Sequence, residues 1–180
     1  FQFDFKSPGE EWEFFEDKKD KTMLVGCFKP GTSAEIRIYY ANNDTGAKAD
    51  KYFEAYEKLS KLKFQDYKHD PAADRVKSGK LEWYRVRYKA EDDTTVNVSA
   101  ELDGLGGMIR LPPTDPEDAA KEKDAGAKKP KARDVTEFLL IQVDGVVRIK
   151  CSTTAGEGGQ YADLFDKMNE SFTLCFARRW

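Results

Sequence analysis

The sequence predicts an α+β fold, an antiparallel sheet of about six strands with two main helices packed on it. Several segments alternate apolar and polar residues with the period of two that is typical of strands. Two other segments place their apolar residues in one stripe at helical spacing. The strongest connections between strands are short turns such as Asp144-Gly145, and such turns join antiparallel neighbours.

The N-terminal part of the chain supplies the first three predicted strands. Residues 10–17 are acidic and aromatic. We interpret them as an edge strand around residues 12–15, with a partner-docking arm as the alternative. Residues 23–28 form a continuous apolar run, which predicts a buried strand. Residues 33–40 alternate between apolar and other side chains and predict the next strand.

The first helix is predicted at about residues 47–63, followed by a short strand at residues 64–69. The apolar stripe of this helix consists of Ala49, Tyr52, Phe53, Tyr56, Leu59 and Leu62. Residues 81–89 then form a strong strand. Residues 94–102 alternate again after an acidic turn, so these two segments predict an antiparallel hairpin.

The C-terminal third completes the sheet. Residues 135–143 are apolar on both faces, which predicts a central strand covered on both sides. The chain returns through Asp144-Gly145 into a strand at residues 146–153. A second amphipathic helix is predicted at residues 160–170, and a last short strand at residues 172–176.

The length of 180 residues fits a single domain, residues 1–180. One segment departs from the pattern. Residues 112–134 are rich in charge and proline, and alanine is their only aliphatic residue. Together with the glycine-rich stretch before them, they predict a flexible insertion at about residues 104–134.

Composition excludes several classes of function. The 30 basic and 33 acidic residues give a net charge of −3, which offers no basic field for nucleic acid. No apolar run is long enough to span a membrane. The only histidine, His69, lies in a polar turn, which argues against a histidine-rich zinc site and a Ser-His-Asp triad. We therefore expect no metal, no cofactor and no catalytic residues, and we interpret the glycine clusters at residues 104–107 and 156–159 as loops.

The three cysteines are interpreted as small buried hydrophobic residues, with one disulfide and one free thiol as the alternative; they are Cys27, Cys151 and Cys175. The chain begins at Phe1 without a methionine. We expect an exported or cell-envelope protein whose signal peptide has been removed.

A basic surface is the main candidate for a binding site. Alternation places several basic residues, flanked by aromatic ones, opposite the apolar side of their strands. The candidate binding residues are Arg37, Trp83, Arg85, Arg87, Arg148 and Lys150. If they share one face, their guanidinium groups can bind a carboxylate or a phosphate. The favoured alternative is that Glu35, Glu101 and Glu137 lie on that face and neutralise it through cross-strand pairs.

The chain resembles the PsbP-like family, which includes a nuclear-transport (Ran-binding) branch and bacterial envelope proteins. The resemblance rests on the helix at residues 52–59 leading into residues 64–67, the strand at residues 81–88, the hairpin at residues 138–149 and the helix carrying Tyr161, Leu164, Phe165 and Met168. It implies an α/β/α sandwich with a non-enzymatic binding or assembly role. No family site motif is matched, so the resemblance assigns no functional residue.

The function expected from the sequence is therefore that of a non-catalytic binding or accessory protein. We expect the partner to be another protein, met through the polar face of the sheet or the charged insertion, with an anionic ligand as a further candidate. Two alternatives stay open: a carboxylate-based hydrolase and a carrier of a small molecule or lipid.

Overall fold

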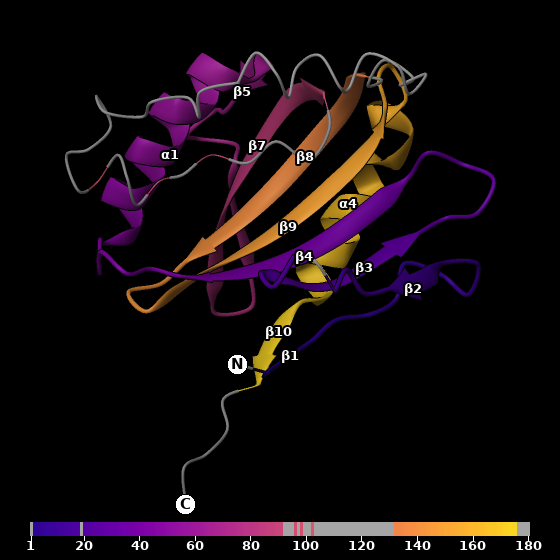
Figure 1. The fold of residues 1–180 in the computed structure, drawn as a ribbon, viewed down its shortest axis with the longest axis horizontal. Coiled ribbons are helices and arrows are strands. Elements are labelled where there is room, and N and C mark those ends of the chain that lie inside the picture. Colours follow the sequence, from indigo (N-terminus) through magenta and orange to yellow (C-terminus); the bar gives the residue numbers. More distant parts are fainter. Residues whose placement is uncertain are drawn as a thin grey trace, which may run out of the picture.

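The computed structural model describes residues 2–18, 20–91, 96, 98, 102 and 132–175. These residues form an eight-stranded antiparallel sheet, two main helices and a separate two-stranded sheet (Figure 1). The strands are β1 Gln2–Asp4, β2 Glu13–Phe15, β3 Met23–Phe28, β4 Glu35–Asn42, β5 Gln65–Lys68, β6 Arg75–Ser78, β7 Leu81–Glu91, β8 Ala132–Ile141, β9 Gly145–Thr154 and β10 Thr173–Cys175. The helices are α1 Ala49–Lys63 and α4 Gly158–Ser171.

The large sheet has the order β2-β3-β4-β9-β8-β7-β5, with β6 also paired to β7. β8 and β9 lie near its centre and are joined by a tight turn, one residue earlier than predicted. Its central residues are Val143 and Asp144, because the Gln142 amide donates to the Gly145 carbonyl and Gly145 is the first residue of β9. Along β8, Phe138 and Leu140 belong to one hydrophobic core, whereas Leu139 and Ile141 belong to the other. The prediction of a central strand covered on both faces is confirmed.

One helix covers each face of the sheet. The apolar stripe of α4 contributes Phe165 and Met168 to the core around Trp83, which is fully buried and meets Phe172 edge-on at 5.2 Å. On the opposite face, Tyr56 of α1 packs in a second core with side chains of β7, β8 and β9. Burying each large side chain contributes about 1.5–3 kcal/mol, so the two cores hold the three layers together.

The predicted fold class is confirmed, and the strand count exceeds the expected six. Two strands, β1 and β6, were not predicted. β6 is four residues long with two exposed basic side chains, Arg75 and Lys77, and β1 has three residues. Such short segments are too brief for a period of two to stand out.

The predicted hairpin of residues 81–89 with residues 94–102 is wrong for the residues that are described. β7 pairs with β8, placing Tyr84 opposite Leu139, and the backbone at Val98 and Leu102 is helical. A spacing of four residues puts these two side chains on one face of a helix, and both contribute to the core on the α1 side. The same apolar residues therefore satisfy a helical period as well as the period of two.

The predicted insertion at about residues 104–134 ends earlier than expected, because β8 begins at Ala132. Residues 103–131 lie outside the described residues, so their flexibility stays a prediction. Cys27 and Cys151 are buried free thiols, as interpreted from the sequence, and burial raises the pKa of Cys27 to about 12. The Cys175 side chain lies outside the described part. Within that part, no helix is long and apolar enough to cross a membrane.

Candidate functional site

The six candidate basic and aromatic residues do not share a surface. The strand register places three of them on the face toward α1, namely Arg37, Arg148 and Lys150. It places the other three on the face toward α4, namely Trp83, Arg85 and Arg87. The expectation of one basic surface is therefore wrong.

The six residues divide between two faces because the alternation of neighbouring strands is not in register: the apolar side of one strand faces α4 and that of another faces α1. Alternation shows which residues of one strand share a face, but it does not relate that face to the next strand. The apolar residues Ile36 and Ile38 of β4 point toward α4. The apolar residues Tyr84 and Val86 of β7 point toward α1. Both faces are covered by helices, so basic side chains on either face lie next to buried residues and need partners.

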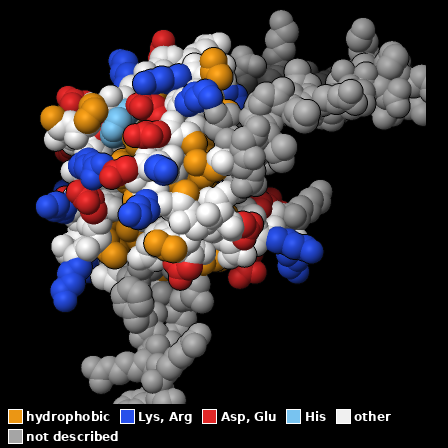
Figure 2. All heavy atoms as spheres, turned by 90° about the vertical axis from the view of Figure 1, so that its left-hand side faces the viewer, with side chains coloured by type: hydrophobic (Ala, Val, Ile, Leu, Met, Phe, Trp, Pro, Cys, Tyr) orange, Lys and Arg blue, Asp and Glu red, His pale blue; other side chains and the backbone are white. Residues whose placement is uncertain are grey.

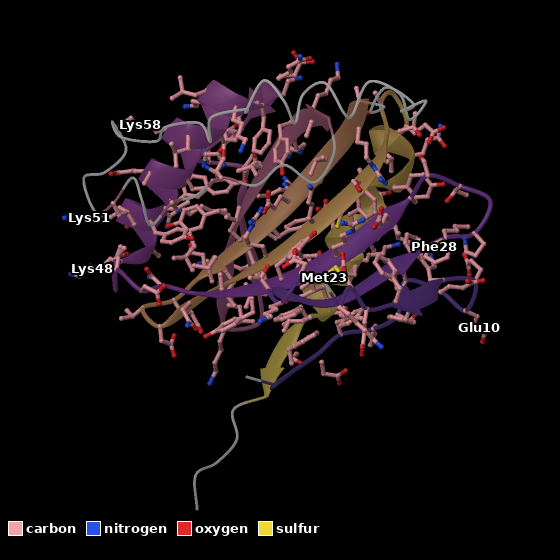
Figure 3. The ribbon with its side chains drawn as sticks, in the orientation of Figure 1. Glu10, Met23, Phe28, Lys48, Lys51 and Lys58 are labelled. Carbon is pink, nitrogen blue, oxygen red and sulfur yellow. The ribbon has the colours of Figure 1, made fainter. Side chains whose placement is uncertain are left out.

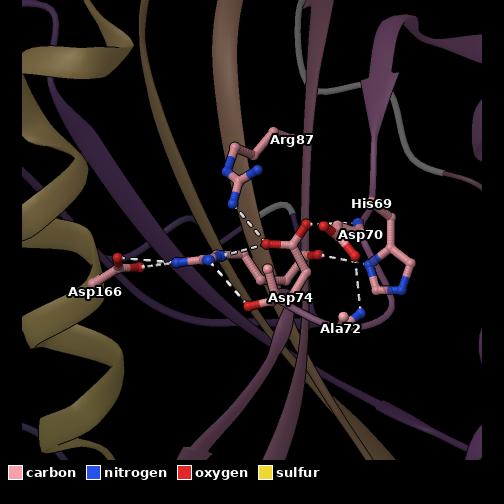
Figure 4. Close-up of polar contacts among 8 residues, drawn as sticks. His69, Asp70, Ala72, Asp74, Arg87 and Asp166 are labelled. Carbon is pink, nitrogen blue, oxygen red and sulfur yellow. Dashed lines mark hydrogen bonds and ion pairs between the residues drawn. The ribbon is translucent and has the colours of Figure 1, made fainter.

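On the α4 face, Arg85 and Arg87 are held by the buried carboxylate of Asp74, which is 1% exposed (Figure 4). Arg85 Nε donates to Asp74 Oδ1 at 2.8 Å, and Arg87 Nη2 donates to the same oxygen at 2.6 Å. Arg85 Nη1 also donates to both carboxylate oxygens of Asp166 on α4, at 3.1 and 3.0 Å. This arrangement, the Asp74 cluster, fastens β7 to α4 and to the turn before β6.

The neighbours of Asp74 shift the pKa of its carboxyl group. Burial raises its pKa, but the backbone N–H of Asp70 and the guanidinium of Arg85 outweigh that effect and lower the pKa below its ordinary value. His69 lies beside the cluster, with Nδ1 3.0 Å from the carbonyl oxygen of Arg85 and its ring 4.7 Å from that of Phe53. It is half-buried rather than a free surface histidine. Acidic and basic side chains intermingle around it (Figure 2).

A groove of about 290 Å³ adjoins the Asp74 cluster between β5, β7, β8 and the start of α4. Its four basic residues are Lys68, Arg85, Arg87 and Lys89, and its three acidic residues are Asp66, Asp134 and Asp166. Lys89 Nζ pairs with Asp66 at 2.6 Å. Asp134 Oδ2 accepts from the amides of Gly156 and Gly158, at 2.7 and 3.3 Å. A protein carboxylate thus occupies the start of α4, and the charges of the groove are largely balanced internally.

On the α1 face, Arg148 forms a buried ion pair with Glu137, which is 0% exposed. The hydroxyls of Tyr56 and Tyr88 both donate to Glu137 Oε2 at 2.7 Å. Burial opposes ionisation, yet the charge of Arg148 and these hydrogen bonds lower the pKa of Glu137. This Glu137 network joins α1, β7, β8 and β9, so Arg148 is a core residue and is not available to a ligand.

Glu35 completes the neutralisation expected on that face. It pairs with Arg37 and, at 3.1 Å, with Arg133. The favoured alternative, cross-strand neutralisation by glutamates, is thus confirmed for Glu137 with Arg148. Glu35 neutralises Arg37 within β4, and Glu101 lies outside the described residues. Together the two faces exclude a single basic surface for an anionic partner.

A set of exposed and half-buried aromatic residues, which we call the aromatic edge, consists of Phe14 and Phe15 in the predicted edge strand and Phe28 in β3. Phe14 is 52% exposed and Phe28 is 37% exposed. The ring of Phe15 lies over Gly26, where a Cβ atom would come within 2.3 Å of it. Glycine at this position therefore allows an aromatic ring to lie flat on the sheet. Figure 3 shows Phe28 and Glu10 at the same end of the molecule, away from the lysines of α1.

The aromatic edge opens into a second groove, of about 520 Å³, which we call the edge groove. It is lined by Phe15, Phe28, Thr32, Ser33, Ala34, Glu35, Ala132, Arg133 and Thr154. Arg133 is fixed there, because Nη2 donates to the carbonyl oxygen of Ser33 at 2.9 Å in addition to its pair with Glu35. The Ser33 hydroxyl is fixed in turn by Glu157 at 2.6 Å. The groove thus combines aromatic rings with a positioned arginine, residue types that often anchor protein interfaces.

The sequence predicted the edge strand but gave no signal for the groove. The groove brings together residues from β2, the β3–β4 turn, β8 and β9, and their proximity follows from the sheet order. No group of three or more histidine, cysteine or acidic residues suited to a metal ion occurs among the described residues.

Three solved structures are similar in fold. LpqN of Mycobacterium tuberculosis, a protein involved in cell envelope biogenesis, matches at 10% identity and a TM-score of 0.53, over 95% of this chain and 82% of LpqN. A cyanobacterial PsbP (CyanoP) from Synechocystis sp. PCC 6803 matches at 9% identity and a TM-score of 0.49, over 96% of this chain and 86% of that chain. A protein of Bacteroides thetaiotaomicron matches at 10% identity and a TM-score of 0.48, over 96% of this chain. This chain spans 45% of the Bacteroides chain.

No protein-family model and no curated protein matches the sequence. A PsbP is among the solved structures that match. At these identities the likeness is one of architecture, an antiparallel sheet with two main helices.

Proposed function

We propose that this chain is a non-catalytic accessory protein that binds another polypeptide through the aromatic edge. The observation that carries the proposal is the exposure of Phe14 in the edge strand β2 and of Phe28 in the neighbouring β3, on opposite faces of the sheet, with Phe28 lining the groove that holds Arg133. Large exposed aromatic side chains beside a fixed arginine are characteristic of protein-binding surfaces.

The two alternative functions receive less support from the geometry. A carboxylate-based hydrolase needs two available acids that face each other across a cleft, about 5–9 Å apart. The edge groove contains one acid, Glu35, and two arginines hold it. In the groove beside α4, Lys89 binds Asp66, backbone amides bind Asp134 and Arg85 binds Asp166. A carrier needs an enclosed apolar cavity, whereas both grooves carry charged residues along their walls.

We further propose that the protein acts outside the cytoplasm, at the cell envelope. This proposal is supported by the fold shared with LpqN, whose description places it in cell envelope biogenesis. Fractionation of cells that express the natural precursor, with detection in the envelope or periplasmic fraction, tests it. Recovery from the cytosol alone would contradict it.

Photo-crosslinking tests the binding surface directly. A photoreactive amino acid is placed at Phe14 or Phe28 in the full chain, and irradiation is carried out in cells of the source organism. The matched controls are Leu62 and Val143, which are also apolar and are 80% and 66% exposed. We expect an adduct with one defined polypeptide from both edge positions and from neither control. Adducts from all four positions, or from none, would refute the proposal.

A further inference from the structure

The large sheet has two outer strands, and they differ in how they are protected. β5 at one end carries a register irregularity and the charged residues Asp66 and Lys68, features that discourage pairing with another strand. β2 at the other end pairs with β3 on one side, and no described strand pairs with its other side. β2 is three residues long and carries Phe14 and Phe15 next to the exposed Glu13. Of the two edges, β2 is the one suited to accept a further strand.

Side chains of β2 are available on both faces of the sheet. Phe14 lies opposite Cys27 and turns toward the α4 side, where its ring is 6.2 Å from that of Phe5. Phe15 lies opposite Gly26 and turns toward the edge groove, with its ring 6.1 Å from that of Phe28. An extended segment added to β2 would place alternate side chains against these two surfaces.

Charge indicates what kind of segment fits. Five carboxylates lie within eight residues around β2: Glu10, Glu11, Glu13, Glu16 and Asp17, and all five are exposed. Glu11 is paired with Lys29 at 3.0 Å. Residues 10–21 contain six acidic residues and three lysines. Because the acidic side chains are in excess, a segment that presents lysine or arginine toward this edge is attracted and an acidic segment is repelled.

We infer that β2 accepts an extended basic segment of the partner polypeptide as an additional strand of the sheet. The inference rests on the proposed function and specifies the chemistry of the partner. Backbone hydrogen bonds to β2 supply affinity. Apolar side chains of the segment contact Phe14 on one face and Phe15 on the other, and its basic residues face the glutamates.

Synthetic peptides provide the test. A fluorescein-labelled eight-residue peptide that repeats Val-Val-Lys-Lys presents both valine and lysine on each face of an extended strand. It is titrated with the full chain, and anisotropy is measured at low salt. The controls are a glutamate–valine peptide of equal length and the lysine–valine peptide N-methylated at alternate residues, which cannot pair as a strand. We expect binding by the first peptide only.

Two matched protein variants localise the binding. We expect the double variant Glu13→Lys/Glu16→Lys to bind the lysine–valine peptide about tenfold more weakly, because each exposed charge pair changes the affinity by a few fold. Glu54→Lys replaces an exposed glutamate of α1, a helix that lies at the other end of the molecule from β2 (Figure 1), and should leave peptide binding unchanged. Near-UV circular dichroism identical to wild type shows that each variant is folded.

The outcomes separate the inference from the proposed function. If Phe14 and Phe28 crosslink a partner but the basic peptide does not bind, the inference is overturned and the proposed function stands. Equal binding of the acidic or N-methylated peptide also overturns the inference. Self-association of the wild-type chain that Phe14→Lys abolishes would assign the edge to a second copy and overturn it as well. If the photo-crosslinking also fails, both fall.

Discussion

The Glu137 network makes a quantitative prediction about the core. Replacing Arg148 with methionine removes the charged partner of Glu137, which is fully buried and bound besides to Tyr56 and Tyr88. Removing one partner of a buried pair costs about 3–5 kcal/mol, because the other charge is left without compensation. A domain of this size has a free energy of unfolding of about 5–15 kcal/mol, so Arg148→Met should remove a large share of it.

The double variant Glu137→Met/Arg148→Met provides the control. With both charges removed, the site becomes apolar and the cost should fall to about 1–2 kcal/mol or less, since replacing a whole buried pair is often neutral. Urea unfolding followed by the fluorescence of the buried Trp12 and Trp83 measures all variants. A double variant that costs as much as Arg148→Met alone or more, or a loss below about 1 kcal/mol for Arg148→Met, would refute a coupled buried pair.

The pH dependence of the same network has a definite sign. The pKa of Glu137 is lower in the folded chain than its ordinary value. Its contribution to stability is therefore fully present above the ordinary glutamate pKa and is lost as the pH falls through the lower, folded value. Wild type should lose stability on acidification in that range, and the double variant should lose less. Equal acid sensitivity of the two would contradict the assignment.

Three further predictions concern the other features. Asp74→Asn should lower the free energy of unfolding by about 3 kcal/mol, because Arg85 and Arg87 lose their shared carboxylate; a loss under about 1 kcal/mol in urea unfolding would contradict the role of the Asp74 cluster. Gly26→Ala should displace the Phe15 ring, lower the free energy of unfolding by about 1 kcal/mol and weaken binding of the lysine–valine peptide. Unchanged peptide affinity would show that the ring position is irrelevant to binding. Deleting residues 113–131 should leave the Tm nearly unchanged, since a charged proline-rich insertion is expected to bury little; differential scanning calorimetry that shows loss of the cooperative transition would disprove this interpretation.

Much of the fold was predictable because the strands and helices carry strong local periods. The stripe of α1, the two-sided apolar run of β8 and the Asp144-Gly145 turn each gave the correct element. The strand prediction is wrong at Val98 and Leu102, because apolar residues four apart satisfy both helical and strand periods when some intervening positions are also apolar. The choice between the two depends on packing against α1, which a local pattern does not contain.

The candidate site was less predictable. Arg37 and Arg85 each lie on the expected side of their own strand, but these sides belong to opposite faces of the sheet. Only the register of β4, β9, β8 and β7 relates one strand to the next. The partners of the arginines come from distant segments, as Asp166 does for Arg85. Phe14 and Phe15 lie in the predicted edge strand, whereas Phe28 was predicted in a buried strand and is 37% exposed. The groove beside them depends on segments distant in the sequence that the fold brings together.

The most direct test of the docking surface is an NMR titration of the isotopically labelled chain with the lysine–valine peptide. The account predicts backbone amide shifts concentrated in residues 10–17 and in the facing residues of β3, with little change in β5 and in α1. Shifts centred on the groove at Lys68 and Arg87, or shifts spread evenly over the sheet, would contradict the assignment of the β2 edge as the binding surface.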